Sequence, residues 1–545
     1  MKGILENGAI ERENFTIQTV NVNIITIIKI EERKMIDGKI LTEKLITYAK
    51  YHLHLNDRDQ IYFRNILLRE LKLDQPTEET LDLEFIKDLS VPDIIVNDLE
   101  QYAVENGLVQ AGLENLFSTY IFGILSPLPS VVNATFREIK ENSGIEKACE
   151  YFYNLSVKNN YVQKTAIGRN LTWEYPDGDK YLEITINLSK PEKDNKEIAK
   201  LLTAPKKAKY PACLLCKENE GFEGTPTHPA RENIRTISLE LGKEKWFVQY
   251  SPYAYYNEHM IAISESHTPM HIGKDTIDKI TDFVDYFPNY MIGSNASLPI
   301  IGGSILNHEH FQGGGHLMPM HHAPVKVQLK SEKYPNVKVG IVDWYNSVIR
   351  LESDNRKEIK SFATDIITSW ETYTDESCGI YANTGEVRHN SLSPVCRKDG
   401  NVYIIDMILR NNRTNSEYPD GIFHAHPEYH NIKKEGIGLI EAMGLFILPG
   451  RLKKQLNMIA EILCKKVDYD EQELFKKDNY LYAHKDMIKS LVEEGYSKDM
   501  EDAQNRITER VNKICKNILF NTAVFKQDKN GQDGFLRFLN ANGVK

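Results

Sequence analysis

Hydrophobic residues recur at helical spacing through the first part of the chain. One expected helix carries its apolar residues on a single face, namely Ile40, Leu41, Leu45, Ile46 and Tyr48. Further along, Pro92 stands directly before Asp93, which is typical of a proline in the first turn of a helix. The pattern predicts an N-terminal helical domain over residues 35–164.

The pattern changes to strand-like runs near residue 165. Residues 173–175 and 181–187 flank Pro176-Asp177-Gly178-Asp179, a combination that indicates a β-hairpin. Apolar residues at helical spacing then predict a helix over residues 275–286. Between hairpin and helix, two more strand-like runs lie at 246–250 and 260–264.

A second mixed unit follows the first. Residues 402–406 are expected to form a strand, and His424-Ala425-His426 lies shortly after them. Because the first unit also combines a strand with a His-x-His pair, the sequence indicates two related halves without an exact repeat. The expected boundaries are 165–345 for the first half, 346–465 for the second half and 466–545 for a C-terminal helical extension.

Residues 1–34 are expected to form an atypical N-terminal extension. A β-prone run at 24–30 is followed by Glu31-Glu32-Arg33-Lys34. Two interpretations remain open, a genuine N-terminal strand or a natural start at Met35 with an appended segment before it.

The composition limits the class of protein. The chain has 545 residues, of which 41% are hydrophobic and 26% charged, and a formal net charge of −10. These values are ordinary for a globular protein of about two to four domains. The acidic balance argues against a nucleic-acid partner bound through bulk positive charge. No apolar run is long enough to predict a membrane span, and seven cysteines without a disulfide pattern favour a reducing cytoplasm.

Residues 308–312 carry the strongest chemical pattern, His-Glu-His-Phe-Gln followed by three glycines. In an extended strand, side chains at i, i+2 and i+4 point to one face, so His308, His310 and Gln312 are expected in one row. The glycines let a ligand approach the backbone, and the row suits a histidine nucleophile acting on phosphorus. The spacing excludes the zinc-peptidase motif, whose histidines stand at i and i+4 of a helix. A structural histidine pair remains the alternative.

Cys213 and Cys216 have the two-residue gap that lets two thiolates share a tetrahedral zinc ion. The best candidates for the two other ligands are His267 and His308. For the cysteines, a redox pair or two unrelated thiols remain open. The second His-x-His pair, His424 and His426, indicates either another metal position or structural and substrate contacts.

Several ordered blocks resemble one family. The segment SLPIIGGSILNHEHFQGG is similar to the signature of the class II UDP-glucose–hexose-1-phosphate uridylyltransferases, also called galactose-1-phosphate uridylyltransferases, in the histidine-triad-like superfamily. Further matching blocks are CLLCKENEGFEG (213–224), HPARENIR (228–235), WFVQYSPYAYYNEH (246–259), RNNRTNSEYPDGIFHAH (410–426) and IKKEGIGLIEAMGLFILPGRL (432–452). The chain departs from the usual pattern at Ser297, Ile301 and Asn307, where Asp, Val and a small residue are common.

The resemblance implies an α+β fold of two histidine-triad-like antiparallel-sheet halves, with the N-terminal helical domain and the C-terminal helical extension added to them. It also implies a double displacement. His310 attacks the α-phosphorus of UDP-glucose, glucose 1-phosphate leaves, and galactose 1-phosphate then takes the uridylyl group. Gln312 donates its amide to a phosphoryl oxygen, His308 becomes a zinc ligand, and no organic cofactor is implied.

The resemblance further implies substrate contacts in a cytoplasmic enzyme, and a homodimer is compatible with it. Lys433 and Lys434 are expected at the hexose phosphate, with a solvated basic pair as the alternative. Glu441, a charge within an apolar run, is expected at the sugar hydroxyls. The remaining expected contacts are Arg231 and Arg235 with phosphates, or else with structural ion-pair partners, and Asn295 and Ser304 with the uridylyl group.

Two other functions remain open. One is another nucleotidyltransferase or a phosphorylase on the same scaffold. The other is a non-enzymatic binding protein stabilised by zinc.

Overall fold

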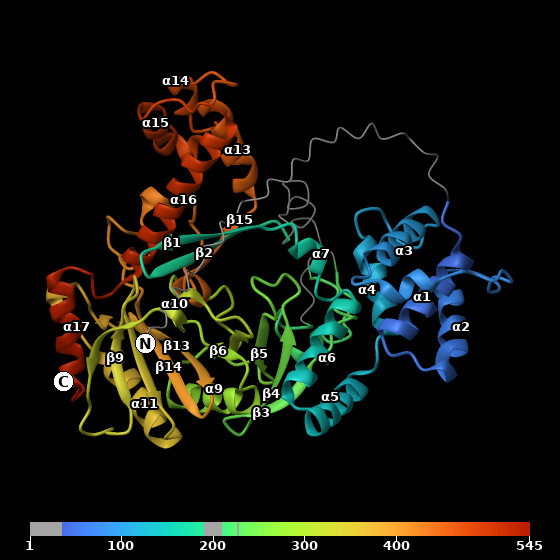
Figure 1. The fold of residues 1–545 in the computed structure, drawn as a ribbon, viewed down its shortest axis with the longest axis horizontal. Helices are drawn as coiled ribbons and strands as arrows, with labels where there is room; N and C mark the ends of the chain where they lie inside the picture. The colour runs from blue at the N-terminus through green and yellow to red at the C-terminus, as the bar shows by residue number, and fades with distance from the viewer. Residues whose placement is uncertain (1–34, 190–209, 226–227) are drawn as a thin grey trace, which may run out of the picture.

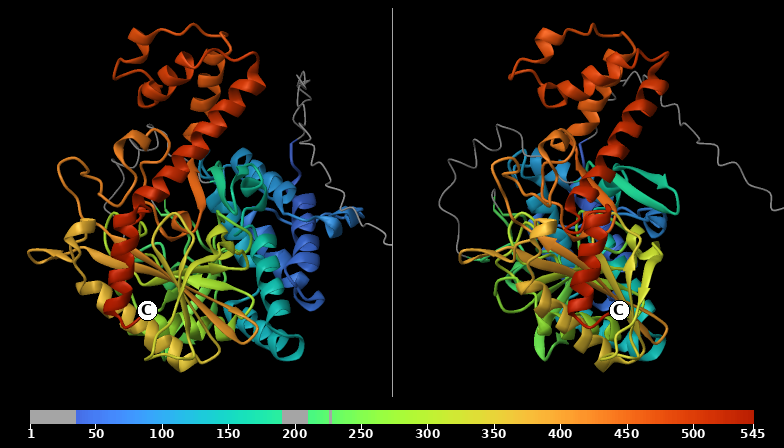
Figure 2. Two further views of the ribbon diagram at one scale, coloured as in Figure 1. Left: turned by 60° about the vertical axis from the view of Figure 1, so that its left-hand side comes forward. Right: turned by 90° about the vertical axis from the view of Figure 1, so that its left-hand side faces the viewer.

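The computed structural model describes residues 35–189, 210–225 and 228–545, so the expected N-terminal extension, 1–34, lies outside the described residues. A large sheet occupies the centre of the molecule (Figure 1). The N-terminal helices lie beyond one edge of this sheet, and long C-terminal helices project away from it (Figures 1 and 2).

The N-terminal domain is helical, as its apolar pattern predicts. Its helices are α1 (Gly38–His52), α2 (Gln60–Glu70), α3 (Asp93–Glu105), α4 (Glu114–Leu125), α5 (Pro129–Ser143), α6 (Ile145–Lys158) and α7 (Lys164–Ile167). Asp37 caps α1 by accepting hydrogen bonds from the backbone of Lys39 and Ile40. α3 begins directly after Pro92. No single described helix is long and apolar enough to cross a bilayer; α4 and α5 meet that test only together, with a bend of 57° between them.

The central sheet has ten strands, and every pairing within it is antiparallel. In sequence order they are β3 (Ile237–Leu241), β4 (Glu244–Tyr250), β5 (Met260–Ser264), β6 (Met291–Gly293), β7 (His310–Gly314), β8 (Val325–Leu329), β9 (Lys338–Val342), β10 (Val348–Ser353), β13 (Asn390–Asp399) and β14 (Val402–Asn411). Their order in space is β3-β4-β5-β7-β6-β13-β14-β10-β9-β8.

Counted inward from either edge, the strands follow the same pattern of connections, so the sheet consists of two related halves. Each half has three consecutive strands, a helix, and two more strands, of which the last lies between the third and the fourth. The helices are α9 (Lys274–Tyr286) and α11 (Arg356–Thr372). β6 and β13 join the halves through Gly293 opposite Val395. The second set begins at Val325, ahead of the boundary expected at 345, because β8 and β9 pair with each other and β9 pairs with β10.

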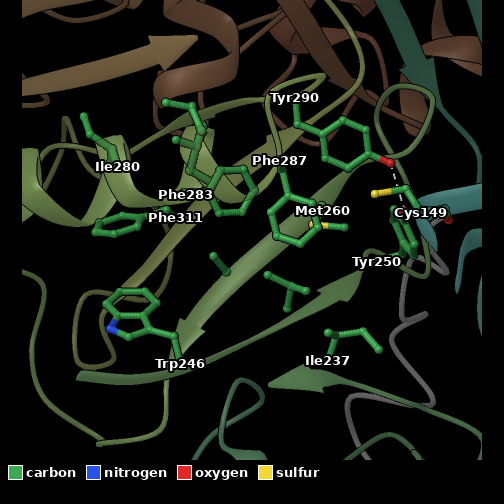
Figure 3. Packing of buried hydrophobic residues seen from close by; sticks show 14 of the residues in the cluster. Cys149, Ile237, Trp246, Tyr250, Met260, Ile280, Phe283, Phe287, Tyr290 and Phe311 are labelled. Carbon is green, nitrogen blue, oxygen red and sulfur yellow. Dashed lines mark hydrogen bonds between the residues drawn. The ribbon is translucent and has the colours of Figure 1, made fainter. Parts of the chain in front are cut away.

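One face of the sheet packs against α9, α11 and the N-terminal helices. Figure 3 shows part of this core, in which the rings of Trp246 and Phe311 stack with their centroids 4.8 Å apart. Phe283 and Phe287 of the α9 region lie beside Phe311 in the same core (Figure 3). Each fully buried large side chain contributes about 1.5–3 kcal/mol to stability, so this face holds the sheet in place.

The opposite face packs against later parts of the chain. The predicted hairpin is confirmed as β1 (Leu171–Asp177) and β2 (Lys180–Asn187). β2 also pairs in parallel with β15 (Leu445–Pro449), which lies far along the sequence. The remaining elements of this region are α10 (Pro319–His322), α12 (Leu439–Ala442), α13 (Arg451–Leu463), α14 (Glu471–Leu474), α15 (Lys485–Glu493) and α16 (Met500–Thr522). The last helix, α17 (Lys529–Ala541), packs instead against α11, with the ring centroids of Phe538 and Trp370 5.3 Å apart. A small hairpin, β11 (Asn383–Thr384) and β12 (Val387–Arg388), follows α11 in the chain. The α+β fold with helical extensions at both ends is confirmed.

Candidate active site

The His-x-His-x-Gln row leads into β7, which lies between β5 and β6 in the first half of the sheet. His310 pairs with Ile263 of β5, and Gln312 pairs with both Ile261 of β5 and Gly293 of β6. Alternation along the strand therefore places His310 and Gln312 on one face, toward β15 and α12. His308 precedes the strand, and its ring turns away to the two cysteines.

The ring of His310 is held in one tautomer. Its Nδ1 lies 2.8 Å from the backbone carbonyl of His308, so Nδ1–H donates and Nε2 keeps its lone pair. Burial lowers the pKa of His310, and the hydrogen bond to the carbonyl only partly opposes this. A neutral imidazole with a free Nε2 is the form that acts as a nucleophile.

Gln312 opens into a cavity of about 690 Å³. This size falls within the range of small-molecule sites. Four of the residues expected to bind substrate line the same cavity as Gln312, namely Asn295, Ser304, Lys433 and Glu441. The structure thus brings together residues from two distant parts of the sequence, 295–312 and 433–441.

Lys433 and Glu441 form a buried pair in the cavity wall. Lys433 Nζ lies 2.9 Å from Glu441 Oε1 and 2.7 Å from the carbonyl oxygen of Ile447. The other oxygen of Glu441 accepts from the backbone N–H of Gly438 at 3.2 Å. Nearby, Asn295 Oδ1 accepts from the N–H of Leu439 at 2.9 Å. These bonds hold an ammonium group, a carboxylate and an amide in place around the cavity.

Three expected contacts do not line the cavity. Arg235 is buried, and its guanidinium donates to five backbone carbonyls, including those of Pro127 and Gly123 at the end of α4. Its hydrogen-bond partners are thus carbonyls rather than acidic side chains. Arg231 lies over the ring of Tyr161 at 5.6 Å. Lys434 is exposed, unlike its neighbour Lys433.

Cys213, Cys216, His267 and His308 come together in space. Their potential ligand atoms all lie within 4.8 Å of one another. Cys213 Sγ is 3.2 Å from His308 Nδ1, and Cys216 Sγ is 3.1 Å from His267 Nδ1. Two thiolates and two imidazole nitrogens at these separations fit a tetrahedral zinc ion. The second ring nitrogen of His308, Nε2, donates to the carbonyl of Ser264 at 2.9 Å and so fixes the orientation of the ring.

This cluster is coupled directly to the row. The carbonyl that orients His310 belongs to His308, one of the four possible metal ligands. Any ion that fixes His308 therefore also fixes the acceptor for His310 Nδ1. His267 in turn has Nε2 3.3 Å from the side-chain amide of Asn307.

Glu309, between the two histidines, points to the opposite face of the sheet. Both of its carboxylate oxygens lie 3.0 Å from Nζ of Lys279 on α9. Only 2% of the Lys279 side chain is exposed, and Glu244 and Asp275 also contact its ammonium group. This ion cluster holds the His-x-His-x-Gln row in place from the face of the sheet opposite His310 and Gln312.

The second His-x-His pair has structural contacts. His424 is buried, and its Nε2 accepts from the backbone N–H of Ile437 at 3.1 Å. His426 stacks on Tyr418 with ring centroids 4.0 Å apart. Within residues 35–189, 210–225 and 228–545, neither histidine belongs to a group of three possible metal ligands.

The sequence did not indicate two residues that contact the candidate site, His259 and Arg410. His259 Nε2 lies 3.2 Å from Gln312 Oε1. Arg410 is fully buried and donates from Nη2 to the carbonyl of Ile437 at 2.6 Å, while His424 accepts from the N–H of the same residue, so the two side chains hold both backbone groups of Ile437. Ile437 lies in the segment between Lys433 and Glu441. The matching blocks contain both missed residues, but spacing along the chain says nothing about such long-range contacts.

Two family models match the chain. The one described as galactose-1-phosphate uridyl transferase, N-terminal domain, matches residues 57–269, and the C-terminal domain of the same family matches residues 282–477. The chain belongs to the galactose-1-phosphate uridyl transferase family. Of the four possible metal ligands, Cys213, Cys216 and His267 lie in the part matched by the N-terminal model, and His308 lies in the part matched by the C-terminal model.

Curated relatives in the galactose-1-phosphate uridyl transferase family match over nearly their full length. A galactose-1-phosphate uridylyltransferase of Caldanaerobacter subterraneus subsp. tengcongensis is 44% identical over 93% of this chain and 99% of its own. Proteins of the same name from Fusobacterium nucleatum and Bacillus subtilis are 42% and 40% identical, each over 92% of this chain and over 98% and 97% of their own. The resemblance drawn from the sequence blocks is confirmed.

Proposed function

We propose that this chain transfers the uridylyl group from UDP-glucose to galactose 1-phosphate through a covalent intermediate on His310. The observation that carries the proposal is the free Nε2 of a neutral, buried His310, two residues before a glutamine that lines the substrate-sized cavity. A covalent intermediate divides one difficult transfer into two easier steps. The names of the relatives supply the substrate class.

In the first step, the lone pair of His310 Nε2 forms a bond to the α-phosphorus of UDP-glucose. The bond from that phosphorus to the bridging oxygen breaks, and glucose 1-phosphate leaves with the electron pair. The ring now carries a positive charge, which the hydrogen bond from Nδ1 to the carbonyl of His308 stabilises. In the second step, a phosphate oxygen of galactose 1-phosphate attacks the same phosphorus and His310 leaves unchanged.

The cavity supplies binding groups for both steps. The Gln312 amide donates to a non-bridging phosphoryl oxygen, where a neutral donor stabilises the group without trapping it. Lys433 offers the remaining hydrogen of its ammonium group to the hexose phosphate, and Glu441 accepts from sugar hydroxyls. Asn295 and Ser304 line the same cavity and contact the uridylyl group.

The proposed metal is zinc, held by Cys213, Cys216, His267 and His308. When bound, it supplies a fixed position for the ligands. Through the carbonyl of His308, the chain then keeps His310 in its reactive tautomer. The seven cysteines are free thiols, which supports a cytoplasmic location for the enzyme.

Intact-mass spectrometry after incubation with UDP-glucose tests the proposal. We expect the protein to gain the mass of a uridylyl group and to lose it when galactose 1-phosphate is added. The His310→Gly variant should stay unmodified. An unmodified wild-type protein, or one labelled by ATP instead of UDP-glucose, would overturn the assignment.

A further inference from the structure

The amide of Gln312 has two chemically opposite ends, and only one of them can stabilise a phosphoryl oxygen. The nitrogen donates hydrogen bonds, whereas the oxygen accepts them and would repel the substrate. An unconstrained glutamine presents either end, because rotation about its last bond exchanges them. Some neighbouring group must therefore decide which end of Gln312 faces the cavity.

His259 is that neighbour. It is buried at the end of the loop before β5, and its Nε2 lies 3.2 Å from Gln312 Oε1. On its other side, Nδ1 faces the backbone N–H of Tyr255 at 3.5 Å. The rings of Tyr255 and Tyr256 flank the imidazole at centroid distances of 5.4 and 4.5 Å, so His259 cannot turn freely.

These contacts select one tautomer. Burial lowers the pKa of His259 to about 4, so the ring is neutral at physiological pH. A neutral imidazole has one donor and one acceptor nitrogen. Because the backbone N–H of Tyr255 can only donate, Nδ1 must accept and Nε2 must carry the hydrogen. The opposite tautomer would point two N–H groups at each other.

We propose that His259 is a positioning residue that donates from Nε2 to Gln312 Oε1 and thereby turns the Gln312 NH₂ group toward the phosphoryl group. Gln312 lines the cavity, and within the described parts of the chain its amide nitrogen has no protein acceptor. His259 is not among the residues that line the cavity, so it acts through Gln312. The inference rests on the proposed uridylyl transfer.

The matched variants are His259→Phe, which keeps a flat ring but removes the donor, and His259→Gln, whose amide nitrogen can replace Nε2. We expect His259→Phe to slow uridylylation by UDP-glucose about tenfold to a hundredfold, because one transition-state donor is no longer oriented. His259→Gln should retain most of the rate. Thermal unfolding and metal content of both variants monitor the fold.

Sulfur substitution provides a readout that a merely structural residue would not change. In the two diastereomers of UDP-glucose α-phosphorothioate, sulfur replaces one or the other non-bridging oxygen, and sulfur accepts hydrogen bonds weakly. The wild-type enzyme should discriminate between them, and Gln312→Ala and His259→Phe should lose the same discrimination. The double variant should be no slower than Gln312→Ala alone. Wild-type discrimination in His259→Phe, or multiplicative losses in the double variant, would overturn the inference.

The tautomer can also be measured in the wild-type enzyme, which keeps the test independent of folding of the variants. A long-range ¹H–¹⁵N spectrum of the imidazole should show the hydrogen on Nε2 of His259, and a hydrogen on Nδ1 would contradict the proposal. Failure of the proposed function looks different, because the wild-type protein would then gain no uridylyl mass at all.

Discussion

The two halves of the central sheet have the same strand order but opposite uses for their polar side chains. Gln312, Gly293, Val395 and Asp406 pair with one another across neighbouring strands, so they lie on one continuous face. In the first half, this face carries His310 and Gln312 beside a cavity. In the second half, it carries a buried ion cluster around Asp406.

The ion cluster is internally satisfied. Asp406 accepts from Arg350 at 2.6 Å and from Arg397 at 2.6 Å, and Arg350 also donates to the carbonyls of Ala323 and Met320. In the first half, by contrast, His310 Nε2 and the Gln312 amide nitrogen have no protein partner among the described residues. The two halves thus differ in whether the polar atoms on this face are paired within the protein or left open to a ligand.

The largest expected effect is that of His310→Gly in the first half. We expect uridylyl exchange to fall by about 10⁴-fold or more, since the nucleophile is lost. The free energy of unfolding should fall by about 2–3 kcal/mol, because the variant loses a buried ring and its hydrogen bond and places a glycine in a strand. Exchange kinetics and urea unfolding measure the two quantities. Retained exchange would place the nucleophile elsewhere.

The corresponding change in the second half is Asp406→Asn. It leaves Arg350 and Arg397 buried without a counter-charge, so we expect a loss of about 3–5 kcal/mol in the free energy of unfolding. Activity per folded molecule should be unchanged. The control replaces the whole cluster with Arg350→Met, Arg397→Met and Asp406→Leu, which should restore much of the stability. Unaltered urea unfolding of Asp406→Asn would show that the cluster is not structural.

Removing a possible metal ligand tests whether the first half depends on an ion. For Cys216→Ser we expect loss of bound zinc and about a tenfold to hundredfold lower exchange rate, because the carbonyl of His308 is no longer held. Elemental analysis and exchange kinetics measure this. The matched control is Cys515→Ser, a buried cysteine outside the cluster. Wild-type zinc content in Cys216→Ser would remove this residue from the ligand set.

The smallest expected effect is that of acid on the ion cluster around Asp406. Burial alone would raise the pKa of Asp406, but Arg397 and Arg350 lower it to about 2 from an ordinary value of 3.8. Its contribution is therefore complete above about pH 4 and is lost as the pH falls toward 2, a change of about 2 kcal/mol. Unfolding of the wild type should show this extra loss between pH 4 and 2 relative to Asp406→Asn. Parallel pH profiles would contradict it.

Much of the local structure follows from the sequence, because its causes are local. The apolar spacing of α1 and α9, the Pro-Asp-Gly-Asp turn between β1 and β2, and the strand β5 all appear as predicted. The Cys-x-x-Cys gap and the His-x-His-x-Gln row also identify their residues. Periodicity, turn chemistry and short ligand spacing are properties of neighbours in the chain, so they can be read without a fold.

Residue type misled where the surroundings decide the role. Arg235 suggested a phosphate contact, yet it donates to carbonyls at the end of α4, more than a hundred residues earlier. The boundary between the halves was expected at 345 because nothing local marks β8 as a partner of β9 and β10. The sequence indicated no role for Glu309, which in the structure forms an ion pair with Lys279 on the opposite face of the sheet.

By itself, the sequence determined the family, the chemical identity of the row and the four possible metal ligands. The tertiary structure was needed to show which nitrogen of His310 is free, that Gln312 lines the cavity, and that backbone carbonyls occupy Arg235. The reason is physical. A side chain brings its donors and acceptors with it, but partners brought close by long-range strand and loop contacts determine which of them remain unpaired.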